Sequence, residues 1–237
     1  MKKILLISNS IVFGYGYLDH CADEIIDFLR PVKTVLFIPY ALKDRNKYTN
    51  IARERMNKMG INLYSIHQQK NPKEAVENAE SIFIGGGNTF RLLNELYKNN
   101  LIGVIRKKVL NGGPYIGTSA GSNVACPTIK TTNDMPIVEP PAFEALNLVP
   151  FQVNPHYFDP DPNSKHMGET REQRIREFVE ENNTTVVGLR EGAWIRIENN
   201  TAQLKGLAGA KIFRKAKLSR EYKAGSKIKF LLNKNKS

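Results

Sequence analysis

One stretch decides the fold of this 237-residue chain: Pro114-Tyr115-Ile116-Gly117-Thr118-Ser119-Ala120-Gly121. Its first half predicts a buried strand, and the glycine-flanked serine that follows is typical of a sharp turn from a strand into a helix. Glycines are expected there because a Cβ would press against adjacent backbone. The pattern matches G-x-S-x-G, in which the turn exposes a nucleophilic hydroxyl. Ser119 is therefore the candidate nucleophile; the alternative is a glycine-rich turn without a chemical role.

Strands and helices alternate on the N-terminal side of this turn. Short apolar runs predict buried strands, and segments with apolar residues at helical spacing predict the helices between them. The predicted strands are residues 3–8, 34–39, 62–66 and 81–84, and the predicted helices are 17–29, 47–59, one opening at Pro72, one opening at Thr89, and 101–110. Strands joined by helices of this length pair in parallel, with helices on both faces of the sheet.

The pattern changes on the C-terminal side. A helix predicted at residues 170–180 precedes short candidate strands at 186–189, 193–198, 201–204 and 210–213, with Asn199-Asn200 as a hairpin turn. We therefore expect an α/β fold in which a mostly parallel sheet, with helices on both faces, gains an antiparallel C-terminal edge. Ligands bind such sheets beyond the carboxyl ends of the strands, so site residues are sought in those loops.

Composition predicts a single domain over residues 1–237. The chain is 41% hydrophobic and 24% charged, and no Ser/Gly-rich or Pro-rich linker divides it. Its two cysteines, Cys21 and Cys126, are too few for a disulfide framework and indicate a reducing compartment, for which we expect the cytoplasm. The apolar run at residues 4–7 is too short for a signal peptide, and no run approaches the roughly 18 residues of a membrane span.

The net charge of +12 is spread along the chain, and the segment from about residue 214 to 237 is the most basic. A basic protein can bind nucleic acid, but no recognition helix, RNP-type aromatic strand or zinc finger accompanies these charges. We expect a solvated basic surface that favours anionic small molecules. No nucleic-acid or membrane partner is expected, and the protein is expected to be a monomer or a homodimer.

A serine hydroxyl needs a base to act as a nucleophile, and His156 is the best candidate. It follows the apolar residues 151–153, where we expect a loop to leave a strand. The alternative for His156 is a hydrogen-bonded structural role. The other histidines are less well placed: His20 falls in a predicted helix, His67 begins a polar loop, and His166 lies in a charged segment.

The base needs an acid that holds its tautomer and stabilises the imidazolium, and Glu191 is the candidate. It follows the predicted strand 186–189, again at a carboxyl end. The alternative is a surface glutamate paired with Arg190. The resulting order Ser-His-Glu differs from the Ser-acid-His order of α/β-hydrolases and argues against membership of that class.

A second glycine cluster, Gly85-Gly86-Gly87-Asn88, follows the predicted strand 81–84 and opens a helix. A phosphate-binding turn is one possible use, but the full G-x-G-x-x-G spacing and a P-loop lysine are both missing. We favour the other use, in which this cluster donates backbone N–H groups to an oxyanion at the end of the neighbouring strand, beside the nucleophile.

Several blocks of the chain are recognisable together: residues 83–90, 117–121, 127–129, 131–138, 154–157, 168–172 and 188–192. These blocks closely resemble peptidase E, the α-aspartyl dipeptidase family. The resemblance extends from the first strand to about Phe213, and the basic C-terminal segment contributes little to it.

This resemblance implies a fold like that of class I glutamine amidotransferases and the hydrolysis of dipeptides with an N-terminal aspartate. It implies Ser119 as nucleophile, His156 as general base and Glu191 as the orienting acid. The oxyanion hole would be formed by the N–H of Ala120 and that of Gly86 or Gly87. No metal or cofactor is implied, and no H-E-x-x-H motif suggests one.

Three further residues are expected to bind the substrate. Aspartate specificity requires a cation, and Arg171 matches the family's Gly-Glu-Thr-Arg block; the alternative is a helix-surface arginine. Asp134 is expected to contact the substrate's α-amino group or to support the site; the alternative is an aspartate that only forms a turn. Asn88 is included as a third contact.

Two other functions remain open. One is a cyanophycinase-like hydrolase of aspartyl-arginine polymer, and the other is a non-catalytic protein that binds an amino acid or dipeptide.

Overall fold

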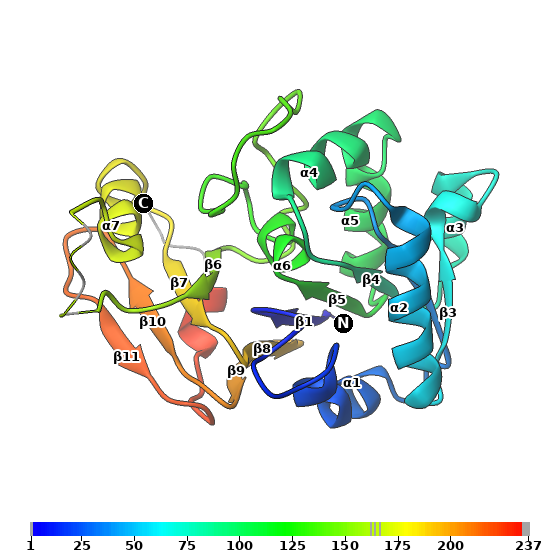
Figure 1. Ribbon diagram of the computed structural model, residues 1–237, viewed down its shortest axis with the longest axis horizontal. Coiled ribbons are helices and arrows are strands. Elements are labelled where there is room, and N and C mark those ends of the chain that lie inside the picture. The colour runs from blue at the N-terminus through cyan, green and yellow to red at the C-terminus, as the bar shows by residue number, and fades with distance from the viewer. Residues whose placement is uncertain (1, 162, 164, 166, 234–237) are drawn as a thin grey trace.

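The computed structural model describes residues 2–161, 163, 165 and 167–233, and its centre is a seven-stranded sheet (Figure 1). Five strands are parallel, and β8 and β9 add an antiparallel edge next to β1. The predicted α/β fold is therefore confirmed. In spatial order the strands are β3 (Asn62–Ser65), β2 (Thr34–Ile38), β4 (Ile82–Ile84), β5 (Tyr115–Thr118), β1 (Lys3–Ile7), β8 (Ala193–Glu198) and β9 (Thr201–Gly206).

Helices cover both faces of this sheet because successive side chains of a strand point to opposite sides. In β1, Leu5 and Ile7 belong to the apolar cluster that contains α1 and α2, whereas Ile4 and Leu6 belong to the cluster that contains α3 to α6. The bounds of these helices are α1 (Ala22–Leu29), α2 (Arg45–Lys58), α3 (Pro72–Asn78), α4 (Thr89–Lys98), α5 (Ile102–Leu110) and α6 (Ala120–Val124), with short 3-10 turns η1 (Asp19–Cys21) and η2 (Ile66–Gln68).

A second, four-stranded sheet lies beside the first, and it corrects part of the predicted topology (Figure 1). We expected the strands at 186–189 and 210–213 to extend the antiparallel edge of the main sheet. They instead pair with two other strands, and α7 (Arg171–Glu181) connects the parallel pair β6 and β7. The order of this sheet is β11 (Arg220–Tyr222), β10 (Ala210–Phe213), β7 (Val186–Arg190) and β6 (Gln152–Tyr157).

One local prediction also needs correction. His156 lies inside β6 rather than in a loop after it, at an irregularity where the register shifts between Pro155 and Tyr157. The basic C-terminal segment contains β11 and a 3-10 turn, η3 (Lys229–Leu232), and its Ile228 is fully buried in the main core. Residues 234–237 of that segment lie outside the described residues, as does His166.

The predicted hairpin turn is confirmed: Asn199 adopts a left-handed φ of 53° between β8 and β9. Among the described residues, no helix combines the length and apolarity needed to cross a membrane. The fold brings the carboxyl ends of β2, β4 and β5 to one edge of the main sheet, where the loops that follow them meet. This edge is where the candidate site lies.

Candidate active site

Ser119 stands at the sharp turn between β5 and α6 with φ 51° and ψ −111°. A non-glycine residue in this region is strained by about 1–3 kcal/mol, so the surrounding packing must hold it. The glycines around it are required by space: a Cβ on Gly121 would collide with the backbone oxygen of Ile84, and one on Gly117 would collide with Gly121. The predicted strand-to-helix turn thus has a direct steric cause.

A hydrogen-bonded chain links Ser119 to two other predicted residues. Ser119 Oγ lies 2.8 Å from His156 Nε2, and His156 Nδ1 lies 2.7 Å from Glu191 Oε1. A carboxylate accepts hydrogen bonds only, so Nδ1 carries the proton and Nε2 is left to accept from the serine hydroxyl. The structure therefore brings together the predicted nucleophile, base and acid.

The imidazole owes its position to the irregularity in β6. His156 has a left-handed φ of 55°, and a bulge of this kind redirects one side chain out of the strand's alternation. Its backbone N–H donates to Ser8 Oγ at 2.9 Å, and that hydroxyl donates to the carbonyl oxygen of Leu189 at 2.8 Å. Ser8 is fully buried and bridges β1, β6 and β7. The sequence analysis missed it, because a serine after a buried strand gives no signal of such a role.

Glu191 follows β7 and does not pair with Arg190, which was its alternative partner. The guanidinium of Arg190 contacts Asp159 at 2.6 Å and Glu221 at 2.9 Å. The next residue, Gly192, donates its N–H to Asn9 Oδ1 at 2.8 Å, which ties the loop after β7 to the end of β1. The carboxylate is 55% exposed and the imidazole 37%, so water reaches this end of the chain of hydrogen bonds.

The predicted oxyanion donors surround Ser119. A Cβ on Gly86 would lie 3.0 Å from Ser119 Cβ, and Gly87 adopts a φ of 132° that disfavours any side chain. Ala120 is the first residue of α6, directly after the serine. Burial raises the pKa of Tyr48, and contacts of its hydroxyl with Tyr17, the Gly86 amide and Thr118 oppose that rise. The Tyr48 hydroxyl thus lies beside the Gly86 amide, and the sequence analysis did not identify Tyr48 as part of the site.

Arg171 begins α7 and faces the nucleophile across a small polar cavity of about 190 Å³. Its Nη1 is buried and makes no hydrogen bond within the described part of the chain, while its guanidinium lies 4.6 Å from the centre of the Phe158 ring. Burial and the neighbouring Arg174 lower the pKa of Arg171, and Glu191 and Asp134 oppose this. A half-buried guanidinium whose Nη1 has no partner among the described residues is suited, beside a nucleophile, to an anionic ligand.

Asp134 and Asn88 tie the loop at 131–137 to the start of α4. Asp134 Oδ2 accepts from the N–H and the hydroxyl of Thr89 at 2.8 and 2.6 Å. The Asn88 side chain caps α4 by accepting from Arg91 N at 3.0 Å and donates to the Met135 carbonyl oxygen at 2.9 Å. Asp134 lines the cavities at Ser119, whereas Asn88 is not among the residues lining them. Both residues thus have a structural use here, and contact with a substrate stays a prediction for each.

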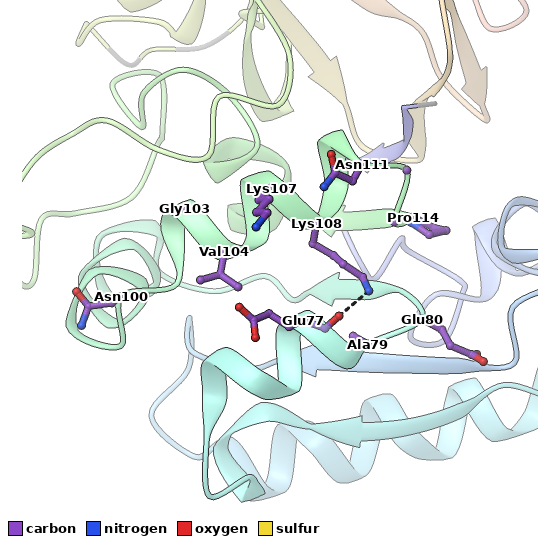
Figure 2. A pocket seen from close by; sticks show the side chains of 12 residues that line it. Glu77, Ala79, Glu80, Asn100, Gly103, Val104, Lys107, Lys108, Asn111 and Pro114 are labelled. Atoms are coloured by element: carbon purple, nitrogen blue, oxygen red, sulfur yellow. Dashed lines mark hydrogen bonds between the residues drawn. The ribbon is translucent and has the colours of Figure 1, made fainter.

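Two cavities flank Ser119, and both are lined by Ser119, His156 and Asp134. The polar one contains Arg171; the other, of about 510 Å³, is mostly apolar. A larger cavity of about 740 Å³ lies between α3 and α5, where Lys108 Nζ donates to the Glu77 carbonyl oxygen (Figure 2). It lies at the opposite ends of the parallel strands, before β4 and β5, and contains none of the predicted site residues.

No cluster of three or more His, Cys, Asp or Glu side chains that could hold a metal ion occurs in the described ranges.

Comparison with known proteins gives consistent results. The pattern of peptidase family S51 matches residues 4–205. A peptidase E from Streptomyces coelicolor is 49% identical over 231 residues, which cover 98% of this chain and 95% of the relative. A probable alpha-aspartyl dipeptidase from Drosophila melanogaster is 46% identical over 236 residues, or 98% of each chain.

Two solved structures share the fold. A putative peptidase E protein from Listeria monocytogenes superposes with a TM-score of 0.67 at 24% identity, covering 88% of this chain and all of that one. A peptidase from an acI-B1 actinobacterium superposes with a TM-score of 0.69 at 18% identity, covering 96% of each chain.

Proposed function

The chain belongs to peptidase family S51, and from that premise we propose that it is a serine-type dipeptidase that hydrolyses dipeptides with an N-terminal aspartate. The single observation that carries the chemistry is the 2.8 Å contact between Ser119 Oγ and His156 Nε2, with Glu191 held 2.7 Å from the other ring nitrogen. A hydroxyl paired with an oriented base is what acyl transfer by a serine requires.

The proposed reaction has two steps. Ser119 Oγ attacks the peptide carbonyl carbon while its proton passes to His156 Nε2. The carbon–nitrogen bond then breaks, His156 returns the proton to the departing amine, and an aspartyl ester remains on Ser119. Water activated by His156 hydrolyses that ester and releases aspartate, while Glu191 stays ionised and stabilises the imidazolium.

We assign the oxyanion hole to the amides of Gly87 and Ala120. The carbonyl oxygen becomes negative during the attack, and donors aimed at it stabilise the transition state. Gly86 and Gly87 were equal candidates from the sequence, but the Gly86 amide faces the buried Tyr48 hydroxyl. Gly86 instead provides the close approach to Ser119 that a side chain would prevent.

Arg171 is proposed to bind the aspartate side chain of the substrate. Its buried Nη1, which has no hydrogen-bond partner in the described part of the chain, and the small polar cavity that it shares with Ser119 support this role. A guanidinium can bind a carboxylate through two hydrogen bonds, and the limited volume favours a short acidic side chain. Asp134 lines the same cavity and is the candidate for the substrate's α-ammonium group.

We treat residues 1–237 as one hydrolytic domain, since the proposed triad draws on both sheets. A reducing compartment such as the cytoplasm suits the two cysteines, both free and buried. A monomer or homodimer without a nucleic-acid partner remains part of the proposal.

The test is hydrolysis of Asp-Leu, followed by release of leucine, with Leu-Asp and N-acetyl-Asp-Leu as controls. We expect cleavage of Asp-Leu only, unaffected by chelators and reduced at least a thousandfold in Ser119→Ala, because the nucleophile is lost. Full activity of the Ser119→Ala variant would contradict the proposed mechanism. Digestion of aspartyl-arginine polymer in place of Asp-Leu would favour the cyanophycinase-like function, and binding of Asp-Leu without hydrolysis would favour a non-catalytic one.

A further inference from the structure

The apolar cavity on the other side of Ser119 has no assigned role. It is larger than the Arg171 cavity, about 510 Å³ against about 190 Å³, and the two meet at the nucleophile and its base. The residues that line it are Asn9, Ser10, Ile11, Tyr17, Leu42, Tyr48, Ile51, Gly86, Gly87, Ser119, Asp134 and His156.

Three aliphatic side chains from three different segments form the open wall of this cavity. Ile11 follows β1, Leu42 follows β2, and Ile51 lies on α2; they are 60%, 38% and 42% exposed. The rings of Tyr17 and Tyr48 meet edge to face beneath them, with centroids 6.2 Å apart. A ligand that covers exposed apolar side chains beside a catalytic group removes apolar surface from water, and this stabilises the complex.

The charges around this cavity favour a neutral occupant. No lysine or arginine is among the described residues that line it, and Asp134 is its one carboxylate. Its Oδ2 accepts from Thr89 and Thr132, and the substrate's α-ammonium group is the partner proposed above for this carboxylate. A cationic side chain would have to compete with that ammonium group for Asp134, and an anionic one would find no cation among the described residues that line the cavity.

Leu42 fixes the position of this wall relative to the reaction. A Cβ added to Gly87 would lie 2.8 Å from Leu42 Cδ2, so the leucine side chain rests against the proposed oxyanion loop. The two Cα atoms of a trans amide lie on opposite sides of its C–N bond and point away from each other. With the aspartyl residue in the Arg171 cavity, the departing residue therefore extends toward Leu42.

We propose that Ile11, Leu42 and Ile51 form the leaving-residue pocket and select dipeptides whose second residue is apolar. This inference rests on the proposed function and adds the class of the second residue. It also disfavours aspartyl-arginine polymer as a substrate, because these aliphatic side chains form no ion pair with its arginines.

The first measurement compares kcat/KM of the wild-type enzyme for Asp-Leu, Asp-Phe, Asp-Gly, Asp-Lys and Asp-Glu. We expect Asp-Leu and Asp-Phe to exceed the other three by about tenfold, which is the scale of discrimination that an apolar pocket provides.

The second measurement uses Leu42→Lys and Ile51→Lys, with Leu110→Lys as the matched control. Leu110 is 41% exposed, close to the 38% of Leu42, but it lies at the end of α5 away from Ser119. We expect each pocket variant to lower the Asp-Leu to Asp-Glu ratio at least tenfold and Leu110→Lys to leave it unchanged. Equal rates for all five dipeptides, or an unchanged ratio in both pocket variants, would overturn the pocket but not the dipeptidase. Absence of all Asp-X cleavage would overturn both.

Discussion

Replacing Arg171 with methionine tests how the protein recognises aspartate. The Nη1 of Arg171 is buried without a partner among the described residues and lines the cavity at Ser119. Removing one partner from a buried charge pair costs about 2–5 kcal/mol. The guanidinium is only half-buried, so we take a value toward the lower end, about 3 kcal/mol. At 1.4 kcal/mol per factor of ten, this predicts a loss of about a hundredfold.

The assay is kcat/KM for Asp-Leu and for Leu-Leu, because the ratio separates recognition of the acidic side chain from catalysis. Arg171→Met should lower the ratio about a hundredfold. Arg174→Met is the control: Arg174 lies on the same helix, is 64% exposed and lies 3.4 Å from the exposed Glu169. It should leave the ratio unchanged.

Protein stability separates a lost contact from a damaged fold. Methionine retains the apolar stem beside Phe158 and removes a buried donor that has no partner among the described residues, so the thermal midpoint should stay constant or rise. An Arg171→Met protein that keeps its midpoint and still prefers Asp-Leu as strongly as the wild type would refute the assignment.

Two further predictions concern residues outside the substrate pockets. Ser8→Ala removes the hydroxyl that accepts from His156 N; leaving that buried N–H unpaired should lower stability by about 1–3 kcal/mol. If Ser8 positions the imidazole, kcat should also fall about tenfold at unchanged KM, and a lower melting temperature with an unchanged kcat would limit Ser8 to a structural role. Burial raises the pKa of the Cys21 and Cys126 thiols to about 12, so both stay protonated at pH 8, and the folded enzyme should remain unlabelled and active in a thiol reagent. Rapid labelling of either thiol before unfolding would contradict this prediction.

The sequence predicted the main sheet well because its signals are local. The parallel strands β1, β2 and β4 contain continuous apolar runs, as in Val35–Ile38 of β2, and the helices between the strands have apolar residues at helical spacing. The turn at Ser119 was predictable because its glycines are needed by backbone crowding within a few residues.

The second sheet could not be predicted in the same way. The strand at Val186–Arg190 is as apolar as one that would join the main sheet, and its partners β6 and β10 are chosen by long-range packing around Tyr157 and Phe213. The bulge at His156 likewise depends on pairing between β6 and β7. Ser8 and Tyr48 act through contacts with residues distant in sequence, and nothing in their own neighbourhoods signals those contacts.

The two sheets divide the proposed machinery between them. His156 and Glu191 belong to the smaller sheet, on β6 and on the loop after β7. Ser119 and the glycines around it belong to the larger sheet, at β4 and β5. A shift of about one ångström between the sheets would separate the serine hydroxyl from the imidazole and leave the imidazole–carboxylate pair intact. Misplacement on that scale lowers the rate about a hundredfold. The turnover rate therefore depends strongly on the position of the smaller sheet relative to the larger one. Mild denaturant or pressure should abolish activity while the helices are still folded.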